Sequence, residues 1–446
     1  MVPNEDSMKT LKRWRIATAL VMVFGYVGYY MIRQNLSAAF PLMHTALGYT
    51  NAQLGLIAAS SEIAYAVGKF LNGPLIDRYG GKRIFLLGMA GGIVCNLLFA
   101  AGSSLAWFIA AWCLCRYFLS MGWGSVTKTM GNWFESEKNG RVMGFASLSL
   151  HFGGVAAALF AGWLVSMGQS WERLFIVPAL AMCVFWVVTL IATRAKPSDV
   201  VPGATMQRPD AKTSLAKFAT DGDHGDVGQV VKTLLTLPVL RQLLLFSFLT
   251  TALRSIFIFW TPKFLVDIGM GASTAIFSSA IFPLLGGIGV VFLGWYTDTH
   301  SRGNRARAMC AMLVGLLVSL LGIAWAVHAG SSFHPLLLVL LGASGFFLLG
   351  PYSMSAGCLS LDIAGPRGAG TCVGLVDGVG YFGGALAAWG VGALSGSLNW
   401  SQIFLLLAGC VPFVLASAFA MSRHFQQMGQ TGSQTVAWPT APLATQ

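Results

Sequence analysis

Arg33 is a permanent positive charge inside an otherwise apolar stretch, FGYVGYYMIRQN. If this stretch is helical, three tyrosines share the face of Arg33: Tyr26, Tyr29 and Tyr30. An arginine within a bilayer costs about 2.5 to 3.5 kcal/mol on insertion scales, so it should face a cavity or a partner. The first hypothesis is therefore an anion-binding site. The alternatives are a side chain that extends to the lipid headgroups or one that pairs with a carboxylate.

The composition predicts that most of the chain lies in a membrane. Of its 446 residues, 55% are hydrophobic and only 10% are charged, whereas soluble domains have about 25% charged residues. Windows of about 20 apolar residues predict twelve spanning helices, and hence an all-α membrane protein. These helices begin near Ile16, Ala52, Ile84, Leu105, Arg141, Leu174, Leu240, Ala272, Ala308, Pro335, Ala369 and Gln402.

A polar, proline-containing segment divides the predicted helices into two sets of six. The predicted organisation is an N-terminal tail at 1–15, a six-helix half at 16–193, a central loop at 194–239, a second six-helix half at 240–421 and a C-terminal tail at 422–446. Outside the spans, basic residues gather on one side, and only Arg173 and Lys263 fall on the other. By the positive-inside rule, both tails and the central loop are cytoplasmic.

Several functions are disfavoured by the same reading. The net charge of +12 belongs to membrane-flanking loops, so nucleic acid is not an expected partner. The cysteines lie in or beside apolar spans without metal-ligand spacing, so we expect neither disulfides nor a metal. We find no phosphate-cradling loop and no nucleophile with a placed base, so neither an enzyme nor a cofactor is predicted.

The two halves repeat a loop signature of glycine, three residues, aspartate and then basic residues. The first copy is GPLIDRYGGKR and the second begins GWYTD. Arg33 precedes Asp77 of the first copy by as many residues as Arg254 precedes Asp298 of the second. Arg254 therefore occupies the position in the second half that Arg33 occupies in the first.

A second repeat lies later in each half, GFASLSLHFGG and GLVDGVGYFGG. It aligns His151 with Tyr381, and Ser147 with Asp377. The glycines indicate close packing between helices. Ionisable residues within a span are functional candidates by default, so His151 and Asp377 join the predicted site.

With its paired loop signature and two sets of six helices, the sequence resembles the major facilitator superfamily. Five segments resemble the organophosphate:phosphate antiporters within it: YYMIRQN around Arg33, AYAVGKF around Lys69, MGW, HFGG at His151, and LRSIFIFWTPKFL around Arg254. That family includes bacterial glycerol-3-phosphate and hexose-phosphate exchangers. GPYSMSAGCLSLD is more similar to the eukaryotic sugar-phosphate exchangers.

The resemblance implies a phosphate site in which Arg33 and Arg254 hold the phosphate and Lys69 and His151 assist. The remaining candidate substrate-binding residues are Tyr26, Tyr29, Tyr30, Tyr65, Asp377 and Tyr381. Lys69 is expected to add a third positive charge, the alternative being that it neutralises Glu62. Asp377 is left three roles: pairing with a cation of the site, binding a sugar hydroxyl, or accepting an ammonium group.

Two departures leave the organic part of the substrate open. Gln34 stands where the glycerol-phosphate carriers have a lysine, and Pro283 stands where they have a glutamate. The resemblance implies exchange of a small organophosphate, such as a sugar phosphate or glycerol phosphate, for inorganic phosphate as the two halves rock. A monomer in the inner membrane of a bacterium is expected.

The repeated loops are predicted to latch helices at the cytoplasmic side and to control opening without touching substrate. The residues assigned to this gate are Asp77, Arg78, Lys82, Arg83, Asp298 and Arg302. Arg116 and Lys128, also within predicted spans, are expected to form structural ion pairs or latches.

Two other functions fit the same fold. One is a proton-coupled or sodium-coupled symporter of organic anions such as sugar acids, for which Glu62 and Asp377 are the candidate titrating carboxylates. The other is a transporter-like sensor that binds external sugar phosphate and signals to a kinase.

Overall fold

A computed structural model describes residues 5–134, 139–202, 235–300, 305–330, 334–355 and 359–430, and all its regular elements are helices. In the first half these are α1 (Glu5–Met31), α2 (Asn35–Leu47), α3 (Asn51–Tyr79), α4 (Gly81–Ala100), α5 (Leu105–Leu119), α6 (Met121–Trp133), α7 (Asn139–Ser166), α8 (Arg173–Ala192) and the short η1 (Pro197–Asp199). In the second half they are α11 (Pro238–Asp267), α12 (Ala272–Ser279), α13 (Ile281–His300), α14 (Arg305–Ala329), α15 (His334–Met354), α16 (Ser360–Leu394) and α17 (Trp400–Gln430).

The described residues form 12 segments that are long and apolar enough to cross a membrane, which confirms the predicted fold class. Three of these segments each consist of two helices separated by a short break: α1 with α2, α5 with α6, and α12 with α13. Ten segments begin close to the predicted positions, and the fifth begins at Ser149, within α7, later than the predicted Arg141. The first begins earlier, at Glu5, because α1 continues through the basic residues that precede Ile16. Most of the central loop lies outside the described residues.

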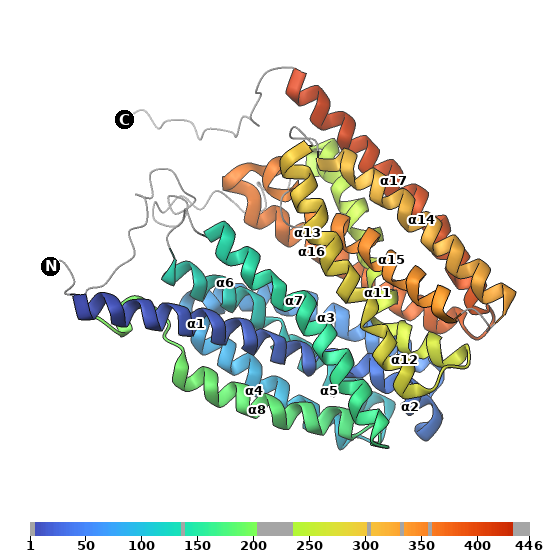
Figure 1. The fold of residues 1–446 in the computed structure, drawn as a ribbon, viewed down its shortest axis with the longest axis horizontal. Coiled ribbons are helices and arrows are strands. Elements are labelled where there is room, and N and C mark those ends of the chain that lie inside the picture. Colours follow the sequence, from blue (N-terminus) through green and yellow to red (C-terminus); the bar gives the residue numbers. More distant parts are fainter. Residues whose placement is uncertain are drawn as a thin grey trace, which may run out of the picture.

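The two halves lie side by side and diverge toward the end where α1 begins and α17 ends, which we call the open face (Figure 1). At the opposite end, the closed face, α2 and α12 lie close together (Figure 1). Across the boundary between the halves, α3 contacts α16, α2 contacts α11, and α7 contacts α12 and α13.

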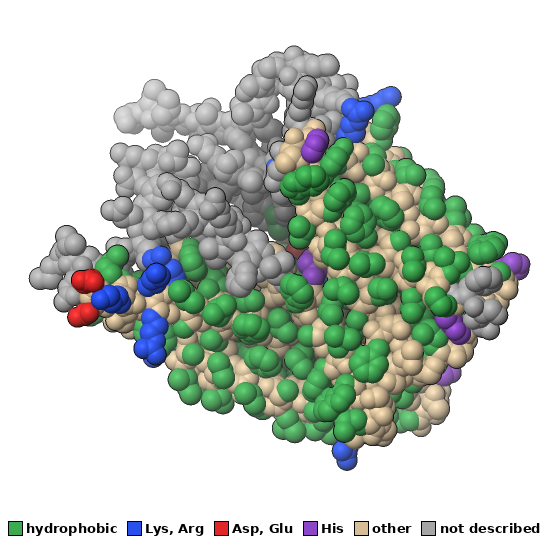
Figure 2. Space-filling model, in the orientation of Figure 1, with side chains coloured by type: hydrophobic (Ala, Val, Ile, Leu, Met, Phe, Trp, Pro, Cys, Tyr) green, Lys and Arg blue, Asp and Glu red, His purple; other side chains and the backbone are tan. Residues whose placement is uncertain are grey.

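The outer surface of the helices is apolar. Side chains such as Phe24, Val184 and Phe413 are more than half exposed, and hydrophobic side chains cover the flank visible in Figure 2. In water such an apolar surface would favour aggregation, whereas lipid acyl chains solvate it well. The surface therefore fits the membrane that the composition predicted.

The break between α1 and α2 is held by two buried asparagines. The Asn35 side-chain amide donates to Asn96 Oδ1 at 2.6 Å, and the Asn96 amide donates to the Ile32 carbonyl at 3.2 Å and to the Gly92 carbonyl at 2.8 Å. The Ile32 carbonyl would otherwise lack a partner where the helix ends, and an unpaired carbonyl is costly in a membrane. These bonds fix the break at Ile32 to Gln34 and thereby set the position of Arg33.

Glycines bring the two halves into contact at the closed face. A Cβ atom added at Gly392 of α16 would lie 2.4 Å from the Asn51 carbonyl oxygen of α3, and one added at Gly55 would lie 2.9 Å from the Ala388 carbonyl oxygen. Distances this short are not tolerated between a side chain and a backbone. Only glycine permits α3 and α16 to approach this closely, so the closed face depends on these positions.

Gly392→Ala should therefore separate the halves at the closed face. Spin labels at Ala46 and Ser397, which are exposed on opposite sides of that face, should move apart in a pulsed magnetic-resonance distance measurement. Gly390→Ala is the matched control, because nothing lies within 4 Å of a Cβ atom there. Equal label distances in the two variants would contradict the role assigned to Gly392.

Candidate functional site

A cavity of about 570 Å³ lies between the two halves. Its lining includes Ile276 of α12, on the side of the closed face, and Trp123 of α6 and Gly294 of α13, toward the open face. Nine of the predicted substrate-binding residues line it: Tyr26, Tyr30, Arg33, Tyr65, Lys69, His151, Arg254, Asp377 and Tyr381. Sequence segments that are far apart in the chain are thus brought together around one space.

The sequence suggested that Arg33 lies within a regular helix. The structure places it instead in the break between α1 and α2. Its guanidinium lies over the Tyr65 ring at 4.6 Å and over the Tyr30 ring at 5.5 Å, and its Nη1 donates to the Tyr65 hydroxyl at 3.4 Å. Aromatic faces attract a cation without cancelling its charge. The guanidinium is therefore positioned while its charge remains available.

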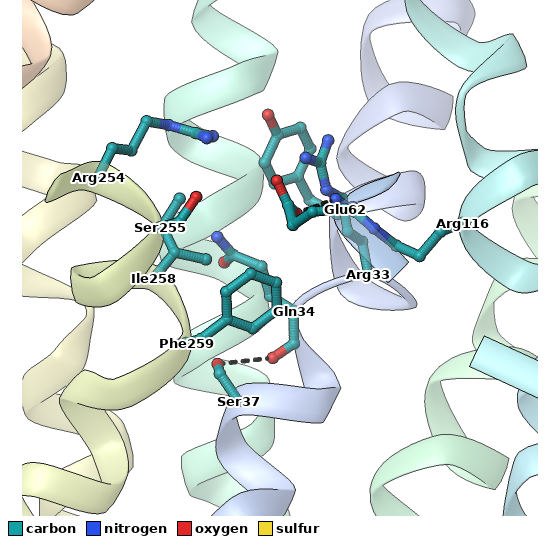
Figure 3. Close-up of a pocket in the computed structure, with 10 residues that line it drawn as sticks. Arg33, Gln34, Ser37, Glu62, Arg116, Arg254, Ser255, Ile258 and Phe259 are labelled. Atoms are coloured by element: carbon teal, nitrogen blue, oxygen red, sulfur yellow. Dashed lines mark hydrogen bonds and ion pairs between the residues drawn. The ribbon is translucent and has the colours of Figure 1, made fainter. Parts of the chain in front are cut away.

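Arg254 of α11 lines the same cavity from the other half, and its guanidinium points toward the first half in Figure 3. Its guanidinium lies over the Tyr352 ring at 4.8 Å. Among the residues that the structure describes, no carboxylate lies within ion-pair distance of either Arg33 or Arg254. The cavity thus holds two uncompensated guanidinium groups, one from each half.

Lys69 and Asp377 form an ion pair across the halves, from α3 to α16, and both line the cavity. The Lys69 ammonium also lies 5.1 Å from the centre of the Tyr381 ring, which packs against the Tyr65 ring at 5.0 Å. Of the roles left open for Asp377, the structure places it in the first, pairing with a cation of the site. Lys69 does not neutralise Glu62.

Glu62 pairs instead with Arg116 of α5, and the two side chains are 3% and 2% exposed. The Arg116 guanidinium lies over the Tyr65 ring at 4.4 Å, so Tyr65 contacts both Arg33 and Arg116. Removing one partner of a buried ion pair typically costs about 3 to 5 kcal/mol. The expectation that Arg116 forms an ion pair agrees with this geometry.

Tyr29 is the predicted site residue that does not line the cavity. Its hydroxyl donates to the Phe85 carbonyl of α4 at 2.7 Å, and its ring packs on the Phe85 ring at 4.9 Å. The prediction assumed that a continuous helix carries Tyr29 and Arg33 on one face. Because α1 ends at Met31, Arg33 turns toward the cavity while Tyr29 remains inside the first half.

Sequence reasoning missed Tyr352 and Trp123, which both line the cavity. Tyr352 lies beside Arg254, but the two are far apart in the chain and no helical spacing connects them. Trp123 packs against Tyr26 at 5.5 Å. It stands in the MGW segment, whose resemblance to the family was the available signal.

The predicted gate residues whose side chains the structure describes, Asp77, Arg78, Lys82 and Arg83, do not line the cavity. Asp77 accepts from Lys128 of α6 at 2.6 Å, and Lys82 donates to the Leu190 and Thr193 carbonyls at the end of α8 at 2.9 and 2.6 Å. Both contacts join helices within the first half. Arg78 lies over the adjacent Tyr79 ring. Arg302 and the side chain of Asp298 lie outside the described residues.

A family model described as the Major Facilitator Superfamily matches residues 22–388. The chain belongs to the major facilitator superfamily. This membership confirms the predicted superfamily and places the chain among transporters, not enzymes.

Proteins similar to this chain include a probable hexose phosphate transport protein of Chlamydia pneumoniae, 26% identical over 426 residues and 92% of each chain. The glycerol-3-phosphate transporter of Bacillus subtilis is 26% identical over 425 residues and 90% of each chain. The membrane sensor protein UhpC of Escherichia coli is 26% identical over 411 residues and 89% of each chain. These are the relatives expected of the organophosphate:phosphate antiporter family, so the resemblance stated from the sequence is confirmed.

Two solved structures share the fold at low sequence identity. A bacterial homolog of the human lysosomal transporter Spinster, in an inward-facing and unoccupied conformation, has a TM-score of 0.74 at 16% identity and covers 93% of this chain and 98% of its own. A D-xylose-proton symporter has a TM-score of 0.69 at 13% identity and covers 92% of this chain and 97% of its own.

Tyr29→Phe tests the position of Tyr29. Losing the bond to the Phe85 carbonyl should cost about 1 kcal/mol, which should appear as a lower melting temperature of the detergent-solubilised protein. Tyr30→Phe is the control, because Tyr30 lines the cavity, where water can reach its hydroxyl, and the described residues give that hydroxyl no hydrogen bond. A Tyr30→Phe melting temperature as low as that of Tyr29→Phe would argue against this assignment.

Proposed function

We propose that this protein exchanges a small organophosphate for inorganic phosphate across the membrane. The observation that carries the proposal is the pair of guanidiniums, Arg33 and Arg254, which enter one cavity from opposite halves without a carboxylate partner among the described residues. Guanidinium presents a planar fork of donors that matches two phosphate oxygens. The names of the relatives, which include hexose phosphate and glycerol-3-phosphate transporters, support the same substrate class.

The charges around the cavity favour a dianion. Lys69 is balanced by Asp377, and Arg116 is balanced by Glu62. The two positive charges that remain, on Arg33 and Arg254, balance the charge of a fully ionised phosphate monoester, which is near −2 at neutral pH. His151 lines the same cavity and can contribute a hydrogen bond to the phosphate.

The cavity leaves room for the organic part of the substrate on the open side of the arginines. Tyr26, Tyr381 and Tyr352 line this region and offer hydroxyl groups and aromatic faces. Such groups suit a sugar or polyol, which carries both hydroxyls and apolar C–H surfaces. We assign Asp377 to holding Lys69 in this wall.

Exchange follows from the charges. When the site is empty, closing the open face would remove the water that screens Arg33 from Arg254, so closure is unfavourable. A bound phosphate removes this penalty, and the halves can then rock about the substrate and expose it on the other side. The contacts of Asp77 and Lys82 stabilise the first half as a rigid body in this movement. We assign the open face, with both chain ends, to the cytoplasmic side of a bacterial inner membrane.

A second candidate function is a sensor of external sugar phosphate, favoured by the similarity to the membrane sensor protein UhpC. A sensor would bind the same ligand in the same site but would carry little of it across the membrane. Transport measurements therefore distinguish the two functions.

Arg33→Lys and Arg254→Lys should each reduce phosphate transport by about tenfold or more, because lysine keeps the charge but loses the fork. The measurement is uptake of labelled phosphate by purified variants in liposomes. Arg423→Lys is the control, since Arg423 lies near the end of α17 over the Phe419 ring, away from the cavity. Rates within about twofold of the unmodified protein for both site variants would refute the paired-arginine site.

Labelled phosphate should enter liposomes preloaded with phosphate and should not accumulate in empty ones, because the empty carrier resists closure. Hexose phosphate or glycerol-3-phosphate added outside should compete with the label. Binding without uptake in loaded vesicles would favour the sensor. Uptake into empty vesicles that follows a proton or sodium gradient would favour the symporter.

A further inference from the structure

Glu62 is an acidic side chain in the centre of a site that must bind an anion. It lies on α3 at 3% exposure, one helical turn before Tyr65, which contacts Arg33. A carboxylate near an anion site weakens binding, since like charges repel strongly where little water is present. A structural need for Arg116 explains why Glu62 is present, but it does not explain why both charges lie beside the arginines.

One carboxylate oxygen of Glu62 is used and the other is not. Oε1 pairs with Arg116, whereas Oε2 is buried and has no hydrogen-bond partner among the described residues. Buried carboxylate oxygens normally have partners, so Oε2 is free to accept a hydrogen bond from a water or to interact with a nearby cation. Ser255 Oγ of α11 is likewise buried and unpartnered.

These unpartnered atoms border a second, much smaller cavity. Its volume of about 10 Å³ has room for about one water molecule. Glu62, Arg33 and Arg116 form one side of it, and Arg254 and Ser255 form the other (Figure 3). A Cβ atom added at Gly384 of α16 would lie 2.5 Å from Ser255 Oγ and 3.4 Å from Glu62 Oε2, so both atoms converge on this glycine from opposite halves.

Glu62 therefore faces both proposed phosphate-binding arginines across a water-sized space. Arg33 and Arg254 line both cavities, whereas Glu62 lines only the small one. The substrate must enter through the large cavity, because the small one has no room for it. The arginines can thus interact with two anions, one tethered and one transported.

We propose that Glu62 is a built-in counter-anion that competes with phosphate for Arg33 and Arg254. This inference rests on the proposed function. When phosphate leaves, the unpartnered Oε2 interacts electrostatically with the two guanidiniums, while Oε1 stays paired with Arg116. When phosphate binds, it must displace this interaction. Glu62 thereby weakens binding enough to let the phosphate leave.

The groups that face Glu62 determine what its substitution does. Arg33 faces it from the break between α1 and α2, Arg116 from α5, and Arg254 with Ser255 from α11. Within the described part of the chain, Glu62 is the one carboxylate that lines this small cavity. Glu62→Gln keeps an oxygen for Arg116 and removes the competing charge, whereas Arg116→Gln frees the whole carboxylate for Arg33.

The test is the dissociation constant for inorganic phosphate of the full-length protein in detergent, measured by titration calorimetry. Glu62→Gln should lower it by about tenfold and Arg116→Gln should raise it by about tenfold. The double variant Glu62→Gln, Arg116→Gln keeps the net charge of the site and removes the competitor, so it should also bind more tightly than the unmodified protein. Glu5→Gln, which removes a carboxylate at the exposed start of α1, outside both cavities, is the control and should leave the constant unchanged.

The double variant decides the matter, and it is also the one expected to fold well because no buried charge is left unpaired. Affinity equal to that of the unmodified protein would mean that Glu62 only balances Arg116, and the inference would be overturned. Weaker binding by a folded double variant would overturn it as well. If the unmodified protein binds neither phosphate nor hexose phosphate, the proposed function fails instead.

Discussion

The structure depends on a repulsion: two guanidiniums, Arg33 and Arg254, share a cavity in the middle of a membrane protein. Two like unit charges repel by about 4 kcal/mol at a separation of about 4 Å and an effective dielectric constant of about 20, and by less at longer range. Neither group can lose its charge, so the protein must keep water near them or supply an anion. The large cavity has room for water beside the two guanidiniums, and the proposed phosphate is the anion.

The other basic side chains around the cavity are paired with carboxylates, so the repulsion is limited to Arg33 and Arg254. Lys69 is paired with Asp377 across the halves, and Arg116 is paired with Glu62 within the first half. Aromatic rings of Tyr65 and Tyr352 hold the two free guanidiniums in place without neutralising them. Four basic and two acidic side chains leave a net charge of +2, which balances that of one phosphate dianion.

The fold was predictable from the sequence because apolar length and the internal repeat depend on the chain alone. The same repeat identified Arg254 as the counterpart of Arg33. The ion-pair partners of the charged residues were not predictable. Helical spacing placed Lys69 near Glu62, but each of the two pairs with a residue on another helix. Tyr29 was misplaced for a related reason. The break that separates it from Arg33 is fixed by Asn35 and Asn96, which meet only in the folded protein.

How strictly such a carrier exchanges its substrates depends on how well the empty site is neutralised. With the arginines alone, closure without phosphate would be strongly unfavourable and exchange would be obligatory. A carboxylate behind them reduces that penalty, but at the same time it weakens phosphate binding. Glu62 is held by Arg116 and so contributes only part of its charge to Arg33 and Arg254. Such a carrier exchanges its substrates less strictly but releases phosphate faster. The balance between the two depends on how strongly Glu62 interacts with Arg116 compared with Arg33 and Arg254.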